Sequence, residues 1–280
     1  MISRIYKFLF RNNYSRNGEK LQPGRVNLEY FKDSVNLGDC LSPVVCEYML
    51  AKRSLSFASP TCDGKIAHLN AIGSILGGRG DYDATVWGSG VRCFSSIRGL
   101  CRKKLYQELD IRAVRGPITR AALEQCGIPC PSVYGDPAIL MPLIYSPNVS
   151  RRHGTVMITH YLTPSEQYRQ FENITLVDIK TEDYKKFIDI ISSAEIVVSS
   201  SLHGIILAEA YGVPAVFLQE GIESETLKFY DWYYSTNRKT VQVASSLQEA
   251  LAVDPMPLPE LKEMQELLMQ AFPFDLWEGK

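Results

Sequence analysis

The sequence contains no apolar run that approaches the roughly 20 residues of a membrane-spanning helix. Its opening residues, MISRIYKFLF, are interrupted by charges and lack the apolar segment and small-residue cleavage site of a secretory signal. The net charge of -1 gives no long-range attraction for nucleic acid. We therefore expect a protein of the cytoplasm that has no nucleic-acid partner.

Cysteine pairs with the spacing of a redox motif or a zinc site are also missing. An odd number of cysteines, 7, is scattered along the chain, which is typical of reduced thiols rather than of a disulfide framework. Cys126 and Cys130 lie too far apart for a CxxC motif, and no second Cys or His pair lies near them in the sequence. We expect reduced cysteines and no metal site.

Three common motifs of nucleotide and hydrolase sites are absent. No GxxxxGK[ST] loop occurs, and GSGVRC at residues 88–93 lacks the third glycine of GxGxxG. The GxSxG elbow of serine hydrolases is missing as well. These absences argue against a P-loop enzyme, a dinucleotide-binding domain of the usual type and a serine hydrolase.

Short apolar runs instead alternate with helical patterns along most of the chain, whose hydrophobic content of 45% is ordinary for a folded protein. Apolar, β-branched runs predict a strand at residues 84–87, one that ends at residue 115 and one that ends at residues 135–136. Four more strands are predicted within residues 155–161, 174–179, 194–200 and 214–218. Helices are predicted between them, one of which begins at Pro117. This alternation predicts an α/β fold with parallel sheets covered on both faces.

A break in composition divides the pattern into two α/β halves. Prolines, serines and basic residues gather in MPLIYSPNVSRRHG, residues 141–154, and predict a linker. Near the end, PLPELKEMQELLMQAF has apolar residues at helical spacing and predicts a helix.

The run VVSSSLHGIILAEAYGVPAVFL, residues 197–218, predicts a strand, a polar turn and a helix that ends at Gly212. Ligands of open α/β sheets bind at the carboxyl ends of strands, where helix N-termini attract anions. Residues 200–204 therefore indicate an anion site, in which Gly204 allows close approach and His203 can exchange a proton near neutral pH. The alternative is that the serines only cap the helix and His203 is a structural polar residue.

Two further carboxylates stand beside glycine, Asp39 in NLGD and Asp136 in YGDP. Each can serve a site, or act only as a helix cap or turn former. The sequence by itself leaves both interpretations open.

Several sequence motifs occur in a recognisable order along the chain. NLGDCLSP, IGSIL, VWGSGV, VRGPITRAAL, YGDPAIL, SSSLHGIILAEAYGVPAV and LKFYDW together resemble the polysaccharide pyruvyl transferase family, in particular its short bacterial exopolysaccharide members, from about residue 36 to residue 231. The resemblance implies two Rossmann-like halves that face each other across a cleft, as in GT-B glycosyltransferases. The expected domains are 1–145 on the acceptor side, 146–256 on the phosphoenolpyruvate side, and a carboxyl-terminal helix, 257–280, that packs back on the first domain.

The activity implied is transfer of pyruvate from phosphoenolpyruvate to two hydroxyls of a sugar, which gives a cyclic ketal and phosphate. Phosphoenolpyruvate would be a co-substrate and no cofactor is expected. The acceptor would be a sugar or lipid-linked oligosaccharide that serves as a surface or exopolysaccharide precursor. The expected location is the bacterial cytoplasm or the inner face of the membrane. Residues 1–20 carry basic side chains that either contact this membrane face or form a solvated arm: Arg4, Lys7, Arg11, Arg16 and Lys20.

Resemblance also suggests roles for residues of the donor site. His203 is the candidate general acid, and Arg115 is the candidate clamp for carboxylate or phosphate. The remaining donor-site residues would surround the phosphate: Ser200, Ser201, Leu202, Gly204 and Lys228. Some relatives carry arginine where this chain has Ser201, so either Arg115, Arg120 or Lys228 supplies the missing charge or the donor is held less tightly.

The acceptor is expected to meet Asn36, Asp39 and Asp136, and Trp232 in the aromatic segment FYDWYY. Stacking on a sugar face and packing of a domain interface are both open for this segment. Two rival functions also remain. One is a nucleotide-sugar glycosyltransferase that uses Glu209, and the other is a non-catalytic protein that binds glycans or phosphate.

Overall fold

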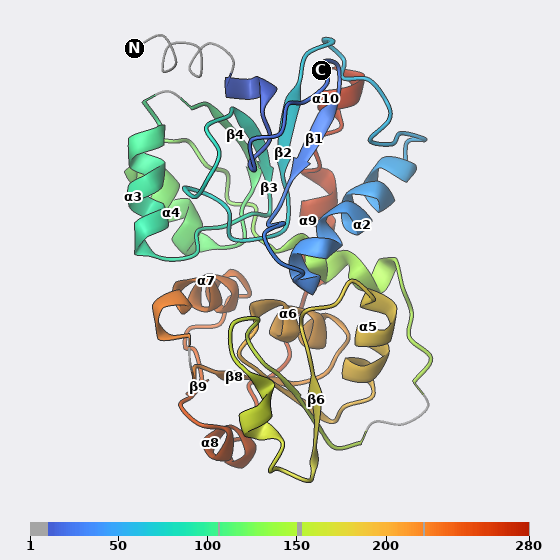
Figure 1. Cartoon of the computed structure of the whole chain (residues 1–280), viewed down its shortest axis with the longest axis vertical. Helices are drawn as coiled ribbons and strands as arrows, with labels where there is room; N and C mark the ends of the chain where they lie inside the picture. Colours follow the sequence, from blue (N-terminus) through green and yellow to red (C-terminus); the bar gives the residue numbers. More distant parts are fainter. Residues whose placement is uncertain (1–10, 106, 150–152, 221, 280) are drawn as a thin grey trace.

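The computed structural model describes residues 11–105, 107–149, 153–220 and 222–279, and within these ranges the strands form two separate parallel sheets, one in each lobe of the molecule (Figure 1). Arg4 and Lys7, which belong to the suggested membrane-facing patch, lie outside the described residues. No described helix is both long enough and apolar enough to cross a bilayer.

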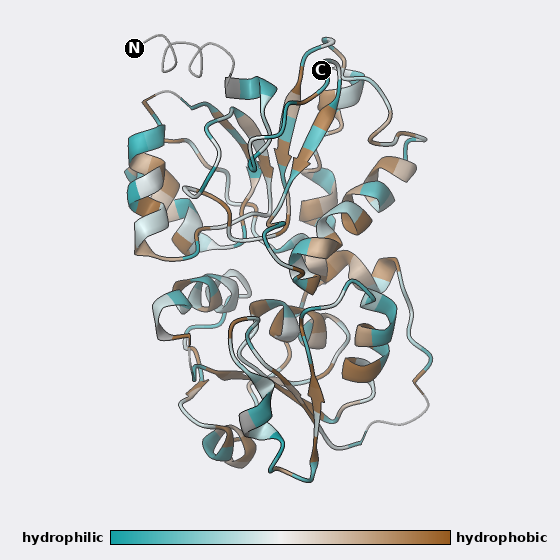
Figure 2. Ribbon diagram, viewed as in Figure 1, coloured by the Kyte–Doolittle hydropathy of each residue, from teal (hydrophilic) through white to brown (hydrophobic). Residues whose placement is uncertain are grey.

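The first lobe contains a four-stranded sheet whose neighbouring strands are all parallel. Its strands, in spatial order, are β1 (Val26–Glu29), β2 (Ala67–Asn70), β3 (Ala84–Trp87) and β4 (Leu109–Ala113). Its helices are α2 (Leu37–Ala51), α3 (Phe94–Lys103) and α4 (Pro117–Gln125), preceded by the short 3-10 turn η1 (Arg11–Asn13). Strands β1 and β2 alternate apolar and polar residues, brown and teal in Figure 2, and their apolar side chains Val26, Leu28 and Leu69 are buried.

The second lobe contains a five-stranded parallel sheet in the order β6-β5-β7-β8-β9. The strands are β5 (Thr155–Ile158), β6 (Ile174–Val177), β7 (Ile196–Ser199), β8 (Ala215–Leu218) and β9 (Val243–Ala244). The helices and 3-10 turns are η3 (Ser165–Tyr168), α5 (Tyr184–Ser192), α6 (Leu202–Ala210), η4 (Glu223–Glu225), α7 (Leu227–Ser235) and α8 (Leu247–Ala252). The chain moves outward to β6 on one side of β5 and to β8 on the other side of β7, so the topological switch point lies between β5 and β7.

One cluster of buried apolar residues runs through both lobes, and each lobe has a further cluster of its own. The 3-10 segment η2 (Pro137–Leu143) packs against α6, whose first eight residues are all buried. A helix that is apolar on every side needs such surroundings. At the start of α2, the backbone N–H of Leu37 donates to the carbonyl of Ile179 in the second lobe (2.9 Å). These contacts hold the ends of the two sheets against each other.

The end of the chain lies against the first lobe. There α9 (Lys262–Gln270) and α10 (Asp275–Glu278) run beside the β1–β4 sheet, in red in Figure 1. Trp87 donates its indole N–H to the carbonyl of Leu268 (2.8 Å), and the ring of Phe272 meets Trp87 edge-on with 4.8 Å between centroids. Gln265 donates to the carbonyl of Ile139 (2.7 Å). The last helices therefore complete the packing of a sheet that formed from the first part of the sequence.

Most of the predicted elements are present, including the strand at residues 84–87 and the helix that begins at Pro117. The predicted strand that ends at residues 135–136 is wrong. Tyr134 makes one isolated bridge to Val114, and Gly135 then turns with φ +140 into η2. The N–H of Val114 donates to the carbonyl of Val133 (3.1 Å) and the carbonyl of Val114 accepts from the N–H of Gly135 (3.0 Å), and the turn at Gly135 then ends the pairing after this single bridge.

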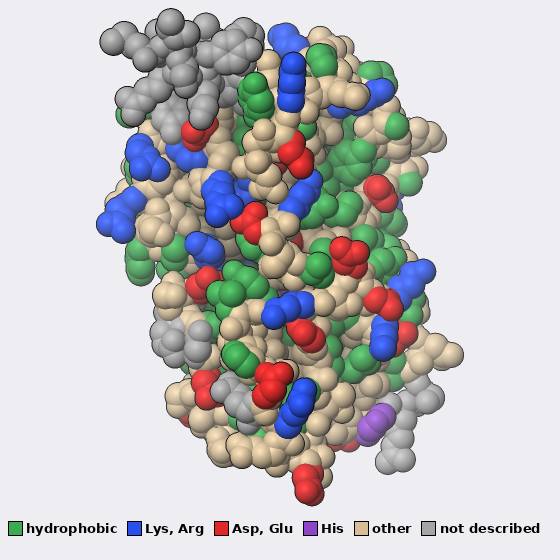
Figure 3. Space-filling view, in the orientation of Figure 1, with side chains coloured by type: hydrophobic (Ala, Val, Ile, Leu, Met, Phe, Trp, Pro, Cys, Tyr) green, Lys and Arg blue, Asp and Glu red, His purple; other side chains and the backbone are tan. Residues whose placement is uncertain are grey.

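The expectation of reduced cysteines is wrong for one pair. Cys101 and Cys126 form a disulfide that joins α3 to the end of α4. Their Cα atoms lie 4.8 Å apart because the two helices pack side by side. On the face that Figure 3 shows, the Lys and Arg side chains of the described residues are interspersed with Asp and Glu, so the described part of this face carries no large patch of one sign.

Candidate active site between the lobes

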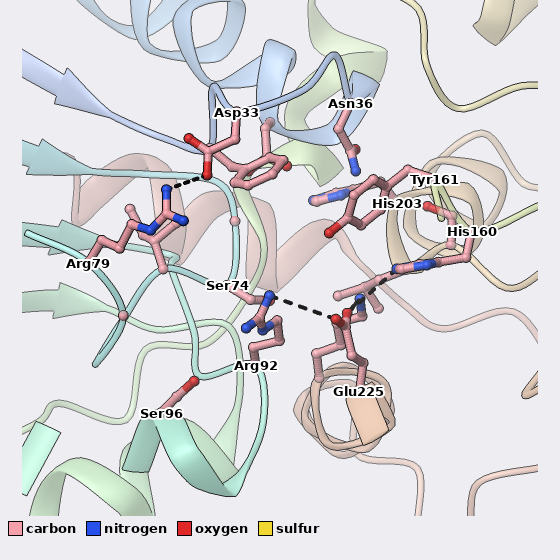
Figure 4. Close-up of a pocket in the computed structure, with 18 of the residues that line it drawn as sticks. Asp33, Asn36, Ser74, Arg79, Arg92, Ser96, His160, Tyr161, His203 and Glu225 are labelled. Atoms are coloured by element: carbon pink, nitrogen blue, oxygen red, sulfur yellow. Dashed lines mark hydrogen bonds and ion pairs between the residues drawn. The ribbon is translucent and has the colours of Figure 1, made fainter. Parts of the chain in front are cut away.

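A cavity of about 230 Å³ lies between the two lobes, at the carboxyl ends of strands of both sheets (Figure 4). Loops and the start of α2 in the first lobe contribute Asn36, Asp39, Ser74 and Arg92 to its wall. Loops, η4 and the first turns of α6 and α7 in the second lobe contribute His160, Tyr161, Ser201, Leu202, His203, Glu225 and Lys228. This is the position where open α/β sheets bind ligands.

His203 lies in the first turn of α6 and packs across the interface against α2. A Cβ atom at Gly38 would lie 1.7 Å from Nδ1 of His203, so a larger residue at position 38 has no room unless the ring moves. The glycine of NLGD therefore allows a close approach between the lobes, which brings His203 into contact with the N-terminus of α2.

Two buried carboxylates flank His203. Nε2 of the ring lies 3.4 Å from Oδ2 of Asp136, whose other oxygen accepts from the N–H of Ala138 and caps η2. Burial raises the pKa of Asp39 to about 6, against the effect of the neighbouring His203 and of a hydrogen bond from the backbone of Phe31. A carboxyl that titrates near neutral pH beside an imidazole can exchange protons with a ligand.

Asp39 and Asn36 reach the cavity because of the turn that starts α2. The side chain of Asn36 accepts from the N–H of Gly38 (3.2 Å) and caps the helix, while the residue also lines the cavity. Behind Asp39, the loop after β2 turns at Gly73, where φ is +116 and a Cβ would lie 2.6 Å from Oδ1 of Asp39. Both residues thus combine a local structural role with access to the cavity.

The three serines before His203 differ in their surroundings. Ser199 shapes the turn, because its Oγ accepts from the N–H of Ser201 (3.0 Å). Ser201 is the N-cap residue of α6 but makes no side-chain cap, and it lines the cavity together with Leu202. Ser200 is buried behind them, and a Cβ at Gly204 would meet Oγ of Ser199 at 2.3 Å. Gly204 therefore allows α6 to pack on β7, and it does not face the cavity.

Arg115 lies behind the wall of the cavity and is completely buried. Its Nη2 lies 3.2 Å from Oδ2 of Asp231, and its Nη1 donates to Oγ of Ser74 (2.6 Å). A Cβ at Gly90 would lie 2.6 Å from the guanidinium carbon, which explains the second glycine of VWGSGV. Ser74, and not Arg115, reaches the cavity.

Lys228 is the buried cation of the cavity wall. Its Nζ donates to Oε2 of Glu225 (2.6 Å). Burial lowers the pKa of the Lys228 ammonium, and the Glu225 carboxylate acts in the opposite direction. Arg120, a candidate to replace the charge missing at Ser201, instead pairs with Glu124 at the surface (2.9 Å).

Trp232 is part of the core. It is fully buried, and its indole N–H donates to Oε2 of Glu209 (2.8 Å). Glu209 also accepts from both terminal nitrogens of Arg238 (2.6 and 3.0 Å). Neither Trp232 nor Glu209 lines the cavity.

Several cavity residues are not identified by the sequence patterns, among them His160, Glu225 and Arg92. His160 follows β5 by two residues, in TVMITHY, and a polar residue just after a predicted parallel strand is a signal that could have identified it. Arg92 lies in the loop after β3, and Glu225 is the last residue of the short 3-10 turn η4, and neither position has a recognisable sequence pattern.

Comparisons with known proteins agree with this architecture. The chain is 26% identical over 220 residues to an uncharacterized protein, L143, of Acanthamoeba polyphaga mimivirus, which covers 74% of this chain and 73% of that relative. It is also similar to the crystal structure of a functionally uncharacterized protein, KP1_0663, from Klebsiella pneumoniae, with a TM-score of 0.52, 12% identity, and coverage of 88% of this chain and 99% of that one. This likeness concerns the fold alone, and the predicted α/β fold with two Rossmann-like halves is confirmed.

Residues 84–220 match the model of the polysaccharide pyruvyl transferase family. The matched segment begins at β3 and ends after β8, so it includes the turn that carries His203. The chain therefore contains a polysaccharide pyruvyl transferase family domain over residues 84–220.

Proposed function

We propose that the protein transfers pyruvate from phosphoenolpyruvate to two hydroxyls of a sugar and releases phosphate. The observation that carries this proposal is the position of His203, which lies between Asp39 and Asp136 at a cavity that also contains the buried cation Lys228. The family of residues 84–220 supports the same reaction.

The reaction requires a proton at C3 of phosphoenolpyruvate. Once C3 is protonated, C2 becomes electrophilic and a sugar hydroxyl can add to it. We assign His203 as the general acid, because its ring lines the cavity and is held by Gly38 on one side and Asp136 on the other. Asp136 acts as a positioning residue because its own side chain does not line the cavity.

The acceptor hydroxyl must lose a proton as it adds. Asp39 is suited to accept it, because its pKa of about 6 is close to neutral pH and its carboxyl lines the cavity. Asn36, at the same turn, can bind a second hydroxyl. The domain that we place at 1–145 would thus bind the acceptor.

The donor would lie against the domain that we place at 146–256. Lys228 and the N-terminus of α6 at Ser201 and Leu202 attract its anionic groups. Arg115 would act through Ser74, which it holds with a hydrogen bond. The segment that we place at 257–280 contributes packing and no group to the cavity wall.

A nucleotide-sugar glycosyltransferase is supported less well by the same geometry. Glu209, the carboxylate that such an enzyme would use, is bound by Arg238 and Trp232 away from the cavity. We therefore propose that the acceptor is a sugar or lipid-linked oligosaccharide, a precursor of a bacterial surface or exopolysaccharide, and that the reaction takes place in the cytoplasm or at the inner face of the membrane.

Incubation of the purified protein with phosphoenolpyruvate and a panel of galactosides, glucosides and mannosides tests the proposal. The expected result is release of phosphate together with the mass gain of one pyruvyl group on a sugar. His203→Ala should remain folded and lose at least about 100-fold in rate, whereas the exposed His153→Ala should keep the full rate. Turnover of a sugar nucleotide without phosphoenolpyruvate would overturn the proposal.

A further inference from the structure

A second histidine faces the cavity from the neighbouring strand. His160 follows β5 as His203 follows β7, and these two strands are paired in parallel with Ile158 opposite Ser199. The switch point of the sheet lies between them, so both imidazoles stand where this fold binds ligands.

The imidazole of His160 is buried and incompletely hydrogen-bonded. The residue is 4% exposed, Nδ1 has no hydrogen-bond partner among the described residues, and Nε2 has no closer polar partner there than the Glu225 carboxylate, at 3.5 Å. One face of the ring packs on Tyr161, with 4.6 Å between centroids. A buried polar group left unpaired is costly, and a ligand that bonds to it in the cavity accounts for its presence.

A single carboxylate stands between His160 and two cations. Oε2 of Glu225 lies 3.5 Å from Nε2 of His160 and 2.6 Å from Nζ of Lys228, and Oε1 lies 3.7 Å from Nη1 of Arg92 (Figure 4). His160 and Lys228 hold the pKa of the Glu225 carboxyl well below its usual range, against the effect of burial. The position of this carboxylate is therefore strongly favourable for an anion.

The two histidines have opposite surroundings. His203 has Asp136 at 3.4 Å and Asp39 nearby, and these carboxylates would repel a phosphoryl group. His160 has Lys228 and Arg92 around the same Glu225 carboxylate, and these cations would attract it. The phosphoryl end of the donor is accordingly favoured on the His160 side of the cavity.

The proposed reaction also needs two protons at two places. One proton goes to C3 when the first hydroxyl adds. The second is needed when the bond between C2 and the phosphate oxygen breaks, because the electron pair of that bond stays on the oxygen and a phosphate trianion is a poor leaving group. The second sugar hydroxyl then attacks C2 and gives up its own proton, so that the overall products are the ketal and hydrogen phosphate.

We propose that His160 contacts the phosphoryl group of phosphoenolpyruvate and donates the proton with which phosphate leaves, and that Glu225 occupies the phosphoryl position in the ligand-free protein. This assignment rests on the proposed function. Asp39 returns the proton of the first hydroxyl to His203 and then accepts the proton of the second hydroxyl, and exchange with water carries that second proton back to His160.

Binding of phosphoenolpyruvate and of inorganic phosphate, measured by calorimetry, tests the phosphoryl site without an acceptor. His160→Gln should weaken both ligands about 10-fold, which corresponds to about 1.4 kcal/mol. Glu225→Gln should tighten both, because it removes a competing carboxylate. His153→Gln is the matched control, since His153 is exposed, and it should change neither. Unchanged affinities in His160→Gln and Glu225→Gln would overturn the assignment.

The leaving group tests the proton donation. The sulfate ester of enolpyruvate releases sulfate, which needs no proton to depart. His160→Gln should lose about 100-fold or more in rate with the phosphate ester and less than tenfold with the sulfate ester. Equal losses on both esters would mean that His160 is only structural. If wild type does not turn over the sulfate ester, the binding titrations alone decide for or against the assignment.

The two proposals fail in distinguishable ways. If the wild type binds phosphoenolpyruvate but transfers pyruvate to no glycan, the proposed function fails and the binding data still show whether His160 and Glu225 form an anion site. If the wild type transfers pyruvate and His160→Gln does so equally fast, the assignment of His160 alone is wrong. His160→Asn serves as a second variant, and thermal unfolding of each variant shows that it is folded.

Discussion

Among single residues, Asp39 links the stability of the protein to pH. Its carboxyl has an ordinary pKa near 4 in the unfolded chain and a pKa of about 6 in the folded protein. The folded protein therefore holds this proton more tightly, and the associated stabilisation is lost as the pH rises through 6. Above that pH, the ionised buried carboxylate costs on the order of 3 kcal/mol.

Asp39→Asn should consequently stabilise the protein on the order of 1–3 kcal/mol near pH 7.5 and change little near pH 4, where the wild-type carboxyl is protonated. Urea unfolding at both pH values measures the difference. The half-exposed Asp33, which pairs with Arg79 at the cavity rim, gives the control Asp33→Asn, for which no such dependence is expected. A gain in Asp39→Asn that is equal at both pH values would contradict the explanation by burial.

Gly38 is a second residue with a measurable effect. Glycine to alanine inside a helix normally stabilises by roughly 1 kcal/mol, but here the new Cβ would meet Nδ1 of His203 at 1.7 Å. We expect Gly38→Ala to destabilise the protein and to lower the rate of pyruvyl transfer at least tenfold by displacing His203. In the double variant Gly38→Ala, His203→Ala, stability should return while activity stays lost, because the clash is gone. Full activity in Gly38→Ala would show that the ring moves without consequence.

At the level of elements, α7 is joined to α4 through Asp231. One oxygen of Asp231 accepts from the N–H groups of Ile118 and Thr119 (2.9 and 3.0 Å), and the other accepts from Oγ1 of Thr119 and pairs with Arg115. This carboxylate caps α4 and neutralises a buried guanidinium at once.

Removal of one partner of a buried ion pair leaves an uncompensated charge, so Asp231→Asn should lower the free energy of unfolding by about 3–5 kcal/mol. Chemical unfolding measures this loss, and the exposed Asp254→Asn is the matched control. We also expect slower turnover in Asp231→Asn, because Arg115 would no longer hold Ser74 at the cavity wall. A loss of less than about 1 kcal/mol would mean that the pair is replaced by other contacts.

The sequence was sufficient for elements that depend on local residues. The strand of residues 84–87, the helix that starts at Pro117 and the turn before His203 each follow from neighbouring apolar, proline and glycine residues. The burial of Arg115 could not be predicted in this way, because its partner Asp231 belongs to the other lobe and arrives much later in the chain. The pairing of Cys101 with Cys126 depends in the same manner on how two helices pack.

The candidate site shows the same limit. Motifs identified His203, Asp39 and Lys228, all of which line the cavity. They did not reveal that Trp232 is in the core, nor that Glu225 stands between His160 and Lys228. Such facts depend on the distance between segments that only the folded chain brings together.

For the whole molecule, the packing of α9 on the first sheet predicts a distant effect on stability. Leu268 is fully buried, lies beside Gly135 and provides the carbonyl that Trp87 bonds to. Leu268→Ala should destabilise the protein by about 2–5 kcal/mol, while each folded molecule should keep its turnover rate because the residue lies outside the cavity wall. Urea unfolding and a rate measured at low temperature test both parts. The neighbouring Leu267 is 38% exposed, and Leu267→Ala should cost far less.

The contact between Trp87 and Leu268 also sets an order of events during synthesis. A ribosome delivers the strands of the first lobe early, but the helix that completes their packing emerges only after the entire second sheet. The second lobe can thus fold completely before the last helix of the first lobe has been synthesised. The lobe whose strands are synthesised first is then the lobe that completes its folding last. Until residue 268 has emerged, the half-covered sheet of the first lobe is the surface that chaperones would need to protect.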